Sequence, residues 1–212
     1  MYQVNEIFHS VQGEGFHVGK PATFIRLQGC SVGCSWCDTQ TTWKAGGEQM
    51  SAAEICINVF PYWRACDRPF IVITGGEPTL YDLDALLDGL RKGRDDGSCW
   101  PYIQLETSGQ NNLKGSLLPD WVTWSPKKNL EYCAPETLLG LVDEVKFVVD
   151  DDLTELQVVD IDALFRRKYP HIVLMPEGCP PTLEHMRKAY EWVLRHPAWR
   201  VIDRLQYRLG VK

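Results

Sequence analysis

Three closely spaced cysteines are the clearest chemical signal in this sequence. Cys30, Cys34 and Cys37 follow the spacing C-x3-C-x2-C, and the next cysteine along the chain is Cys56. A closed iron–sulfur or structural zinc site takes four protein ligands. Three thiolates on a 4Fe–4S cluster leave one iron with an open position, where a small molecule can bind and react. The spacing therefore favours a catalytic cluster over a zinc knuckle that lacks a ligand, or over thiols that are close by chance.

A second motif follows a short apolar run. Residues 70–74 are nearly all apolar, as expected for a strand buried on both faces, and Gly75-Gly76-Glu77-Pro78 ends that run. Two glycines let backbone amides and carbonyls approach a ligand closely, and Glu77 adds a carboxylate that suits a cationic amino group. Alone, this turn is weak evidence for a binding site.

The two motifs, in this order, resemble those of the radical S-adenosylmethionine (SAM) superfamily. In that superfamily the aromatic residue before the third cysteine, here Trp36, lies beside the adenine of the cofactor. The Gly-Gly-Glu-Pro turn contacts the methionine part of SAM. The resemblance implies that both motifs line one cofactor site.

Further segments narrow the resemblance to the 7-carboxy-7-deazaguanine synthase family. In chain order these segments are 12–15 (Gln-Gly-Glu-Gly), 24–30, 36–39, 75–78, 106–109 (Glu-Thr-Ser-Gly) and 125–127 (Ser-Pro-Lys). The similarity covers roughly residues 3–150 and fades beyond them. In relatives the final residues reach into the substrate site, but residues 205–212 of this chain do not match that pattern.

The resemblance implies an activity. Family members convert 6-carboxy-5,6,7,8-tetrahydropterin into 7-carboxy-7-deazaguanine, contracting a ring and losing ammonia, in 7-deazapurine (queuosine) biosynthesis. The implied cofactors are a 4Fe–4S cluster, SAM and Mg²⁺. The reduced cluster cleaves SAM, the 5′-deoxyadenosyl radical takes a hydrogen from the substrate, and SAM is regenerated. A reductant such as flavodoxin and a homodimer are the implied partners.

The resemblance also implies roles for individual residues. Cys30, Cys34 and Cys37 match the cluster ligands, and Thr39 matches the Mg²⁺ ligand. The implied SAM contacts are Trp36, Cys37, Asp38, Gly76, Ser125, Pro126 and Lys127, and the implied substrate contacts are Val11, Gln12, Gly13, Arg26 and Thr74. A guanidinium at position 26 suits a two-pronged contact with a carboxylate, and a surface salt bridge is the alternative. No residue is assigned to the proton transfers.

Two other functions stay open on the sequence alone. A radical SAM activase of a glycyl-radical enzyme would share the cysteine loop and the size of the chain, but it would need a docking surface for a large protein. Arg26 and the segment 12–14 favour a small carboxylated substrate instead. A zinc-binding interaction module would be non-catalytic and would hold zinc in place of iron.

The elements that position these motifs alternate between strands and helices. We expect strands at 22–27, 70–74, 102–106, 121–125, 144–149, 171–175 and 199–202. We expect helices that begin at Ser51, at Asp82, at Asp160 and at Thr182. Pro61 should limit the first helix, and the third should run to about residue 168. The last helix should place Leu183, Met186, Tyr190, Val193 and Leu194 on one face.

This alternation predicts an α/β fold built on a parallel sheet. A complete eight-fold barrel normally takes about 250 residues, and the connection from 107 to 120 is short for a helix. We therefore predict a partial, TIM-like barrel of parallel strands with outer helices, open on one side. The cysteine loop follows the carboxyl end of its strand, which is where such sheets place their chemistry.

Composition and charge exclude some classes of protein. The 212 residues suit one domain (1–212), and 44% apolar and 24% charged residues are ordinary for a globular protein. A net charge of −6 argues against binding to a nucleic-acid backbone. With no apolar run of membrane-spanning length and no signal peptide, we expect no membrane partner and a cytoplasmic protein with reduced thiols. The remaining cysteines should be isolated core or surface residues: Cys56, Cys66, Cys99, Cys133 and Cys179.

Overall fold

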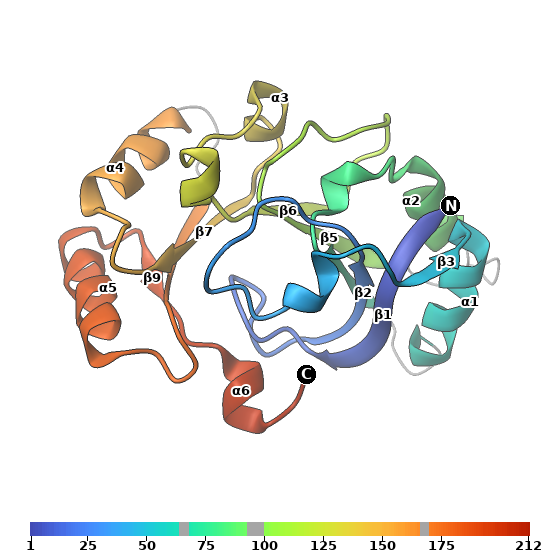
Figure 1. Cartoon of the computed structure of the whole chain (residues 1–212), viewed down its shortest axis with the longest axis horizontal. Helices are drawn as coiled ribbons and strands as arrows, with labels where there is room; N and C mark the ends of the chain where they lie inside the picture. Colours follow the sequence, from blue (N-terminus) through green and yellow to red (C-terminus); the bar gives the residue numbers. More distant parts are fainter. Residues whose placement is uncertain (64–67, 93–99, 166–169) are drawn as a thin grey trace.

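The computed structural model describes residues 1–63, 68–92, 100–165 and 170–212. Within these ranges nine strands form one curved sheet, in the order β3-β1-β2-β4-β5-β6-β7-β8-β9, with helices along its outside (Figure 1). The strands are β1 Tyr2–Val11, β2 Pro21–Leu27, β3 Glu48–Met50, β4 Phe70–Gly75, β5 Tyr102–Thr107, β6 Trp121–Trp124, β7 Glu144–Val149, β8 His171–Pro176 and β9 Arg200–Val201. The helices are α1 Ala52–Trp63, α2 Asp84–Lys92, α3 Glu136–Leu139, α4 Glu155–Leu164, α5 Leu183–Arg195 and α6 Leu205–Leu209, with the 3₁₀ turns η1 Gln40–Thr42, η2 Pro78–Leu80 and η3 Lys128–Leu130.

The pairing of the strands confirms the predicted partial barrel. From β2 to β9 each strand pairs in parallel with the next strand in the sheet. The described end strands β3 and β9 do not pair with each other, so the barrel is not closed. No helix separates β5 from β6, as the short connection predicted.

The first strand was missed by the sequence-based prediction, which began the sheet at residue 22. β1 runs antiparallel to both β2 and β3 and buries Tyr2 and Val4. The Tyr2 hydroxyl donates a hydrogen bond to the Asp82 carbonyl at 2.9 Å and accepts one from the Leu86 amide at 3.2 Å. The polar residues that hid this strand lie on its less buried positions.

Two predicted helix limits were wrong. α1 continues through Pro61 to Trp63, which is 2% exposed, because a proline in the last turn removes one hydrogen bond while the Trp63 ring still packs into the core. α4 begins at Glu155, since Thr154 and Gln157 form a reciprocal capping box, so Asp160 lies inside the helix and does not cap it. The expected end near residue 168 lies outside the described residues.

The apolar stripe predicted on α5 is not the side of the helix that faces the core. Thr182 caps this helix as predicted, but the side chains buried against the sheet are His185, Ala189 and Trp192. Much of the predicted apolar stripe is exposed instead: Leu183, Met186, Tyr190 and Leu194. Both stripes fit a helical period, and the stripe that carries the large Trp192 ring is the one that faces the core.

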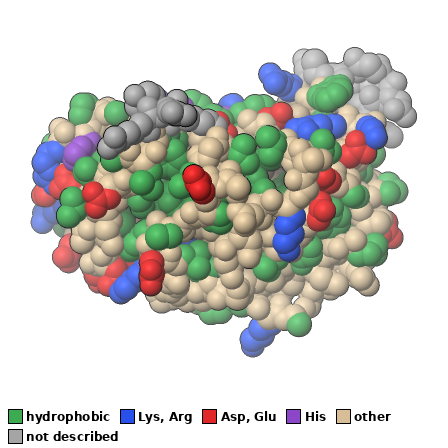
Figure 2. Space-filling view, turned by 90° about the horizontal axis from the view of Figure 1, so that it is seen from above, with side chains coloured by type: hydrophobic (Ala, Val, Ile, Leu, Met, Phe, Trp, Pro, Cys, Tyr) green, Lys and Arg blue, Asp and Glu red, His purple; other side chains and the backbone are tan. Residues whose placement is uncertain are grey.

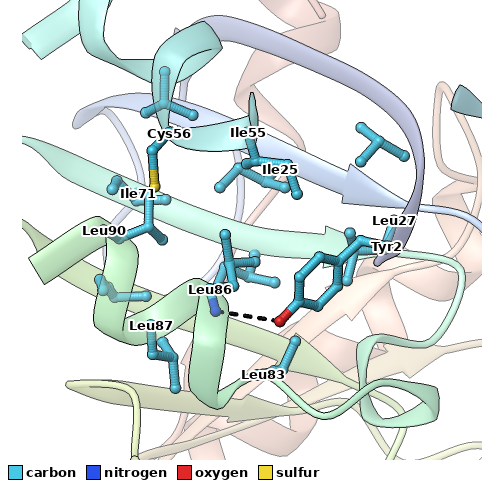
Figure 3. Close-up of a cluster of buried hydrophobic side chains, with 14 of the residues drawn as sticks. Tyr2, Ile25, Leu27, Ile55, Cys56, Ile71, Leu83, Leu86, Leu87 and Leu90 are labelled. Atoms are coloured by element: carbon cyan, nitrogen blue, oxygen red, sulfur yellow. Dashed lines mark hydrogen bonds between the residues drawn. The ribbon is translucent and has the colours of Figure 1, made fainter. Parts of the chain in front are cut away.

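The two larger hydrophobic clusters of the described residues hold the strands in place, and a small third one joins β2 to β4. The first joins β1, β2, β4 and β5 to α1 and α2, and Figure 3 shows its side chains around the bond between Tyr2 and the Leu86 amide. The second lies between β6, β7 and β8 and the helices α4 and α5. Together they fix the carboxyl ends of the parallel strands relative to one another, and the loops at those ends form the site.

The surface carries no large area of one charge on the face drawn in Figure 2, where acidic and basic side chains alternate among apolar ones. Among the described helices, none is both long enough and apolar enough to cross a lipid bilayer.

Candidate active site

A cavity of about 210 Å³ lies where the loops after β1, β2, β4, β5 and β6 converge, and the loop after β2 carries the three cysteines. Cys30, Cys34 and Cys37 all line the cavity. The Cys37 amide donates to the Cys34 carbonyl at 3.1 Å, which curls the loop into a tight turn. The Asn129 side chain donates to the Val32 carbonyl at 2.7 Å and ties the loop to the segment after β6. Burial raises the pKa of the Cys30 and Cys34 thiols.

The three thiols fit a cluster better than a single ion. Among the described residues there is no set of three donors spaced to hold one metal ion. A 4Fe–4S cluster binds one thiolate at each of three different irons. Its three protein ligands therefore lie further apart than the ligands of a single metal ion, around a half-buried pocket. All three cysteines are free, half-buried and on the wall of one cavity. The donor set therefore suits a 4Fe–4S cluster, for which thiolates are the usual protein ligands.

The Gly-Gly-Glu-Pro turn packs directly on the cysteine loop. The amides of Gly76 and Glu77 donate to the carbonyls of Leu27 and Gly29 at 2.9 and 2.7 Å. A Cβ at Gly76 would lie 2.0 Å from the Gly29 oxygen and 3.0 Å from the Cys30 Cβ. The turn thus needs glycine there because the two backbones touch.

Glu77 does not line the cavity, contrary to the sequence-based expectation. Its carboxylate is fully buried and accepts hydrogen bonds from Thr79, Thr107 and Ser108. These bonds join the turn after β4 to the end of β5. A buried carboxylate whose oxygens are satisfied in this way holds two loops together and is not available to a cofactor.

Most residues predicted to contact SAM lie together on one wall of the cavity. Those that line it are Trp36, Cys37, Asp38, Gly76, Ser125 and Lys127, whereas Pro126 is not among the lining residues. The Lys127 ammonium lies 4.8 Å from the centre of the Trp36 ring and donates a hydrogen bond to Ser125 Oγ. Burial lowers the pKa of Lys127 to about 8.

All five residues predicted to contact substrate line the same cavity: Val11, Gln12, Gly13, Arg26 and Thr74. Gln12 and Thr74 both donate to the Glu106 carboxylate, at 2.9 and 3.1 Å. Arg26 donates to Glu6 at 3.1 Å and to Thr39 Oγ1 at 3.1 Å. Arg26 therefore forms a salt bridge with Glu6, which was the alternative interpretation of this residue. Its side chain also lines the cavity.

Four charged residues on the cavity wall, which we call the charged floor, form one connected group: Glu14, Glu106, Lys146 and Arg204. Lys146 Nζ is 2.7 Å from Glu14 and 3.8 Å from Glu106, and Arg204 Nε is 3.5 Å from Glu14. Burial alone would raise the pKa of Glu14, but Lys146 and Arg204 outweigh it and lower that pKa to about 2. Burial opposes the charged form of Lys146, but Glu106 and Glu14 raise its pKa above the usual value.

The sequence-based site list omitted the whole charged floor. One signal was available, because Lys146 is a charge in the middle of the apolar β7 sequence Glu-Val-Lys-Phe-Val-Val, all of which is buried. A lysine at such a position needs a buried partner. Its neighbour Glu144 is also buried, which raises the pKa of that carboxyl group.

The end of the chain returns to the cavity, although its sequence did not match. The Leu205 amide donates to the Gly13 carbonyl at 2.9 Å, and Gln206 donates to Glu14 at 3.0 Å. The Tyr207 hydroxyl donates to Asp38 at 3.1 Å, so α6 reaches the cysteine loop as well. Gln206 and Lys212 line the cavity.

The remaining cysteines that the structure describes are core or surface residues, as predicted, and none of them lines the cavity. Cys56 is buried in the core, and Cys133 and Cys179 are exposed. The predictions for Cys66 and Cys99 fall outside the described residues.

Comparisons with known proteins agree with this geometry. Residues 11–110 match the family described as a 4Fe-4S single cluster domain. The 7-carboxy-7-deazaguanine synthase of Bacteroides thetaiotaomicron is 36% identical over 204 residues, which covers 95% of this chain and 93% of that protein. The enzyme of the same name from Prochlorococcus marinus is 34% identical and covers 97% of this chain and 96% of its own length.

Solved structures point to the same family. The crystal structure of QueE from Escherichia coli superposes with a TM-score of 0.75 at 30% identity, over 96% of this chain and 94% of that one. A radical SAM methyltransferase from Sphaerobacter thermophilus has a TM-score of 0.53 at 18% identity over 86% and 66% of the two chains, a likeness of fold alone. The relatives match over nearly their full length, and the three-cysteine loop and the cavity beside it are those of a cluster enzyme. The chain therefore belongs to the 7-carboxy-7-deazaguanine synthase family of radical SAM enzymes, which use a 4Fe–4S cluster and SAM.

Proposed function

We propose that this protein converts 6-carboxy-5,6,7,8-tetrahydropterin into 7-carboxy-7-deazaguanine, a carbon–nitrogen lyase reaction in the biosynthesis of 7-deazapurines such as queuosine. The observation that supports the proposal most directly is that one cavity joins the three-cysteine loop to all five predicted substrate residues. Relatives that match over nearly the whole chain carry the name of this activity.

Arg26 would bind the carboxylate of the substrate. Its guanidinium lies on the cavity wall, held by Glu6 and Thr39 on its Nε and NH1 sides. The planar guanidinium suits a carboxylate in a way that a lysine ammonium does not. The fused rings of the substrate would lie deeper, over Gln12, Gly13 and Thr74, whose polar groups face the charged floor.

The cluster would be held by Cys30, Cys34 and Cys37, and SAM by Trp36, Cys37, Asp38, Gly76 and the segment 125–127. When bound, these two cofactors supply the carbon radical that removes a hydrogen atom from the substrate. The protein holds the target atom close to that radical and keeps other hydrogen donors away. Loops from five strand ends and the returning α6 provide this enclosure.

Mg²⁺ would bind at Thr39. The Thr39 hydroxyl lies on the cavity wall and donates to Asp38 at 3.0 Å, so two oxygen-bearing side chains are adjacent there. Hard oxygen ligands and substrate oxygens suit Mg²⁺. Because Arg26 also contacts Thr39, the ion and the guanidinium would share the substrate carboxylate. A Thr39→Val variant should need more Mg²⁺ for half-maximal turnover while it keeps its cluster.

The proposed partners are a small pterin substrate, a reductant such as flavodoxin, and a second copy of the chain. Exposed apolar side chains on α5, Leu183 and Leu194 among them, offer surface that a homodimer would cover. We propose that the protein works in the cytoplasm, where thiols and reduced clusters persist. Neither nucleic acid nor a membrane is a proposed partner.

The alternative, an activase of a glycyl-radical enzyme, is not favoured. The relatives reported above are named for the small-molecule reaction. The cavity also carries buried charges suited to a polar small molecule, with Lys146 and Arg204 each under one-tenth exposed.

The test is an anaerobic assay with reconstituted protein, dithionite, SAM, Mg²⁺ and 6-carboxytetrahydropterin, with the product detected by mass spectrometry. We expect 7-carboxy-7-deazaguanine to form without net consumption of SAM. Arg26→Gln should raise KM for the substrate, whereas the matched change Arg91→Gln on α2 should not. A protein with a full cluster that forms no product would contradict the proposal and favour the activase.

A further inference from the structure

The indole of Trp36 is anchored by a residue that no sequence motif includes. Trp36 lines the cavity, and its Nε1 donates a hydrogen bond to Asp150 Oδ2 at 3.2 Å. Asp150 follows β7, is separated from Trp36 by 114 positions, and is not among the lining residues. Asp150 therefore reaches the cavity wall through its contact with Trp36.

The Asp150 carboxylate is itself fixed in place. Its Oδ1 accepts hydrogen bonds from the amides of Asp152 and Leu153, at 3.1 and 2.8 Å. Leu153 is buried in the second core cluster, so this turn is attached to the interior of the protein. One carboxylate oxygen thus closes the turn while the other holds the indole.

The same loop is tied to its neighbours on two sides. His185 and Lys188 of α5 contact it, His185 Nε2 lying 2.9 Å from Asp151 Oδ1 and Lys188 Nζ donating to the Asp150 carbonyl at 2.5 Å. Lys128 of η3 forms an ion pair with Asp152 at 2.6 Å. These contacts make residues 150–153 a firm support for the edge of the Trp36 ring, while Lys127 lies over its face.

We propose that Asp150 is a positioning residue that holds the Trp36 indole in place as a wall of the SAM site. The inference rests on the proposed SAM contact of Trp36 and extends it to a residue outside the cavity. Binding of SAM against a fixed indole costs less conformational entropy than binding against a mobile one, because a side chain that is already immobilised loses no rotamer freedom.

Asp150→Asn tests this role because the two side chains have nearly the same shape. An amide has one acceptor oxygen, so it cannot serve both the turn and the indole N–H, as the carboxylate does. We expect the variant to keep its iron content and to bind SAM about tenfold more weakly, as for a lost hydrogen bond to a charged acceptor. Asp160→Asn, the same charge change on the exposed side of α4, is the matched control.

A second readout does not depend on activity. In protein labelled with 5-fluorotryptophan, the ¹⁹F resonance of Trp36 is assigned from its loss in Trp36→Phe. It should shift or broaden in Asp150→Asn and stay unchanged in Asp160→Asn. Combining Asp150→Asn with Trp36→Phe should weaken SAM binding no more than Trp36→Phe alone, because the contact is already gone.

Three results would overturn the inference: an unchanged Trp36 resonance in Asp150→Asn, SAM affinity within about twofold of the wild type, or additive effects in the double variant. Failure of the proposed function looks different, since a wild-type protein with a full cluster would then bind SAM but form no 7-carboxy-7-deazaguanine, and the effects of Asp150→Asn on the Trp36 resonance and on SAM affinity would remain.

Discussion

Two parts of the cavity wall are built in different ways. The part that we call the mouth consists of the cysteine loop and the Gly-Gly-Glu-Pro turn, short segments whose backbones touch at Gly29 and Gly76. The charged floor takes its four residues from the loop after β1, from β5, from β7 and from the segment before α6. In the proposed function the mouth would hold a cofactor that is common to a superfamily, and the floor would face the substrate. The motifs of the mouth are contiguous in the sequence, whereas the floor exists only once the chain has folded.

The forces that hold the two parts also differ. Backbone hydrogen bonds and a glycine contact join the segments of the mouth. The floor depends on buried charges, which are stable only while each one keeps its partner. Substitutions at the mouth should therefore act mainly on cofactor loading, and substitutions at the floor mainly on folding stability.

The largest effect is expected at the mouth. Cys34→Ala removes one of three thiolates, and the protein should lose both its cluster and all turnover while it remains folded. Iron analysis and the anaerobic assay measure the two losses. Cys133→Ala, a change at an exposed thiol, should alter neither. A Cys34→Ala protein that retains the cluster would show that this loop is not the ligand.

At the floor, Lys146→Met should lower the free energy of unfolding by about 3–5 kcal/mol, because it leaves buried carboxylates without their cation. Lys146 has 8% of its side chain exposed and contacts both Glu14 and Glu106. Urea denaturation measures the change. Lys92→Met breaks an exposed pair on α2 and should cost no more than about 0.5 kcal/mol. Equal losses of unfolding free energy in the two variants would show that the ion pairs of the floor stabilise the protein no more than an exposed pair does.

The floor should also respond to acid. The pKa of Glu14 is about 2 in the folded protein, below its ordinary value of 4.5. Protonation therefore opposes folding, and the stability that Glu14 contributes, at most about 3 kcal/mol, is present above its ordinary pKa and is lost as the pH falls toward 2. The stability difference between wild type and Glu14→Gln should shrink over that range. Glu48→Gln, an exposed control on β3, should show no such trend.

The smallest expected effect comes from Gly76→Ala. Its Cβ would press on the Gly29 carbonyl and on Cys30, so the loop must shift, at a cost of about 1–3 kcal/mol and with reduced iron content. Gly140→Ala is the control, because its backbone is helical and the nearest atom to a new Cβ is 3.9 Å away. Full iron loading in Gly76→Ala would show that the cysteine loop can shift without losing the cluster.

The contrast between the two parts explains what the sequence could and could not predict. The parallel strands were identified because they are rich in β-branched and aromatic residues, and the mouth because its motifs are contiguous. β1 was missed since its partly buried positions carry polar residues. The buried side of α5 could not be predicted, because two stripes fit the helical period and only packing of Trp192 decides between them.

The ion pairs of the floor could not be predicted, although Lys146 stands out as a charge in an apolar strand. Glu14 and Lys146 are 132 positions apart, and neither local sequence indicates that the other residue is its partner. The motif predicted that Glu77 contacts the cofactor, but its carboxylate oxygens accept hydrogen bonds from Thr107 and Ser108 at the neighbouring strand end. Local sequence specifies which residues occur at a strand end, and tertiary packing decides which way they face.

Electron paramagnetic resonance of oxygen-free, dithionite-reduced protein tests the central claim most directly, since that claim is an iron site left open for SAM. We expect about four irons per chain and a reduced-cluster signal that changes when SAM is added. A colourless protein that holds zinc, or a cluster signal that SAM leaves unaltered, would contradict the account.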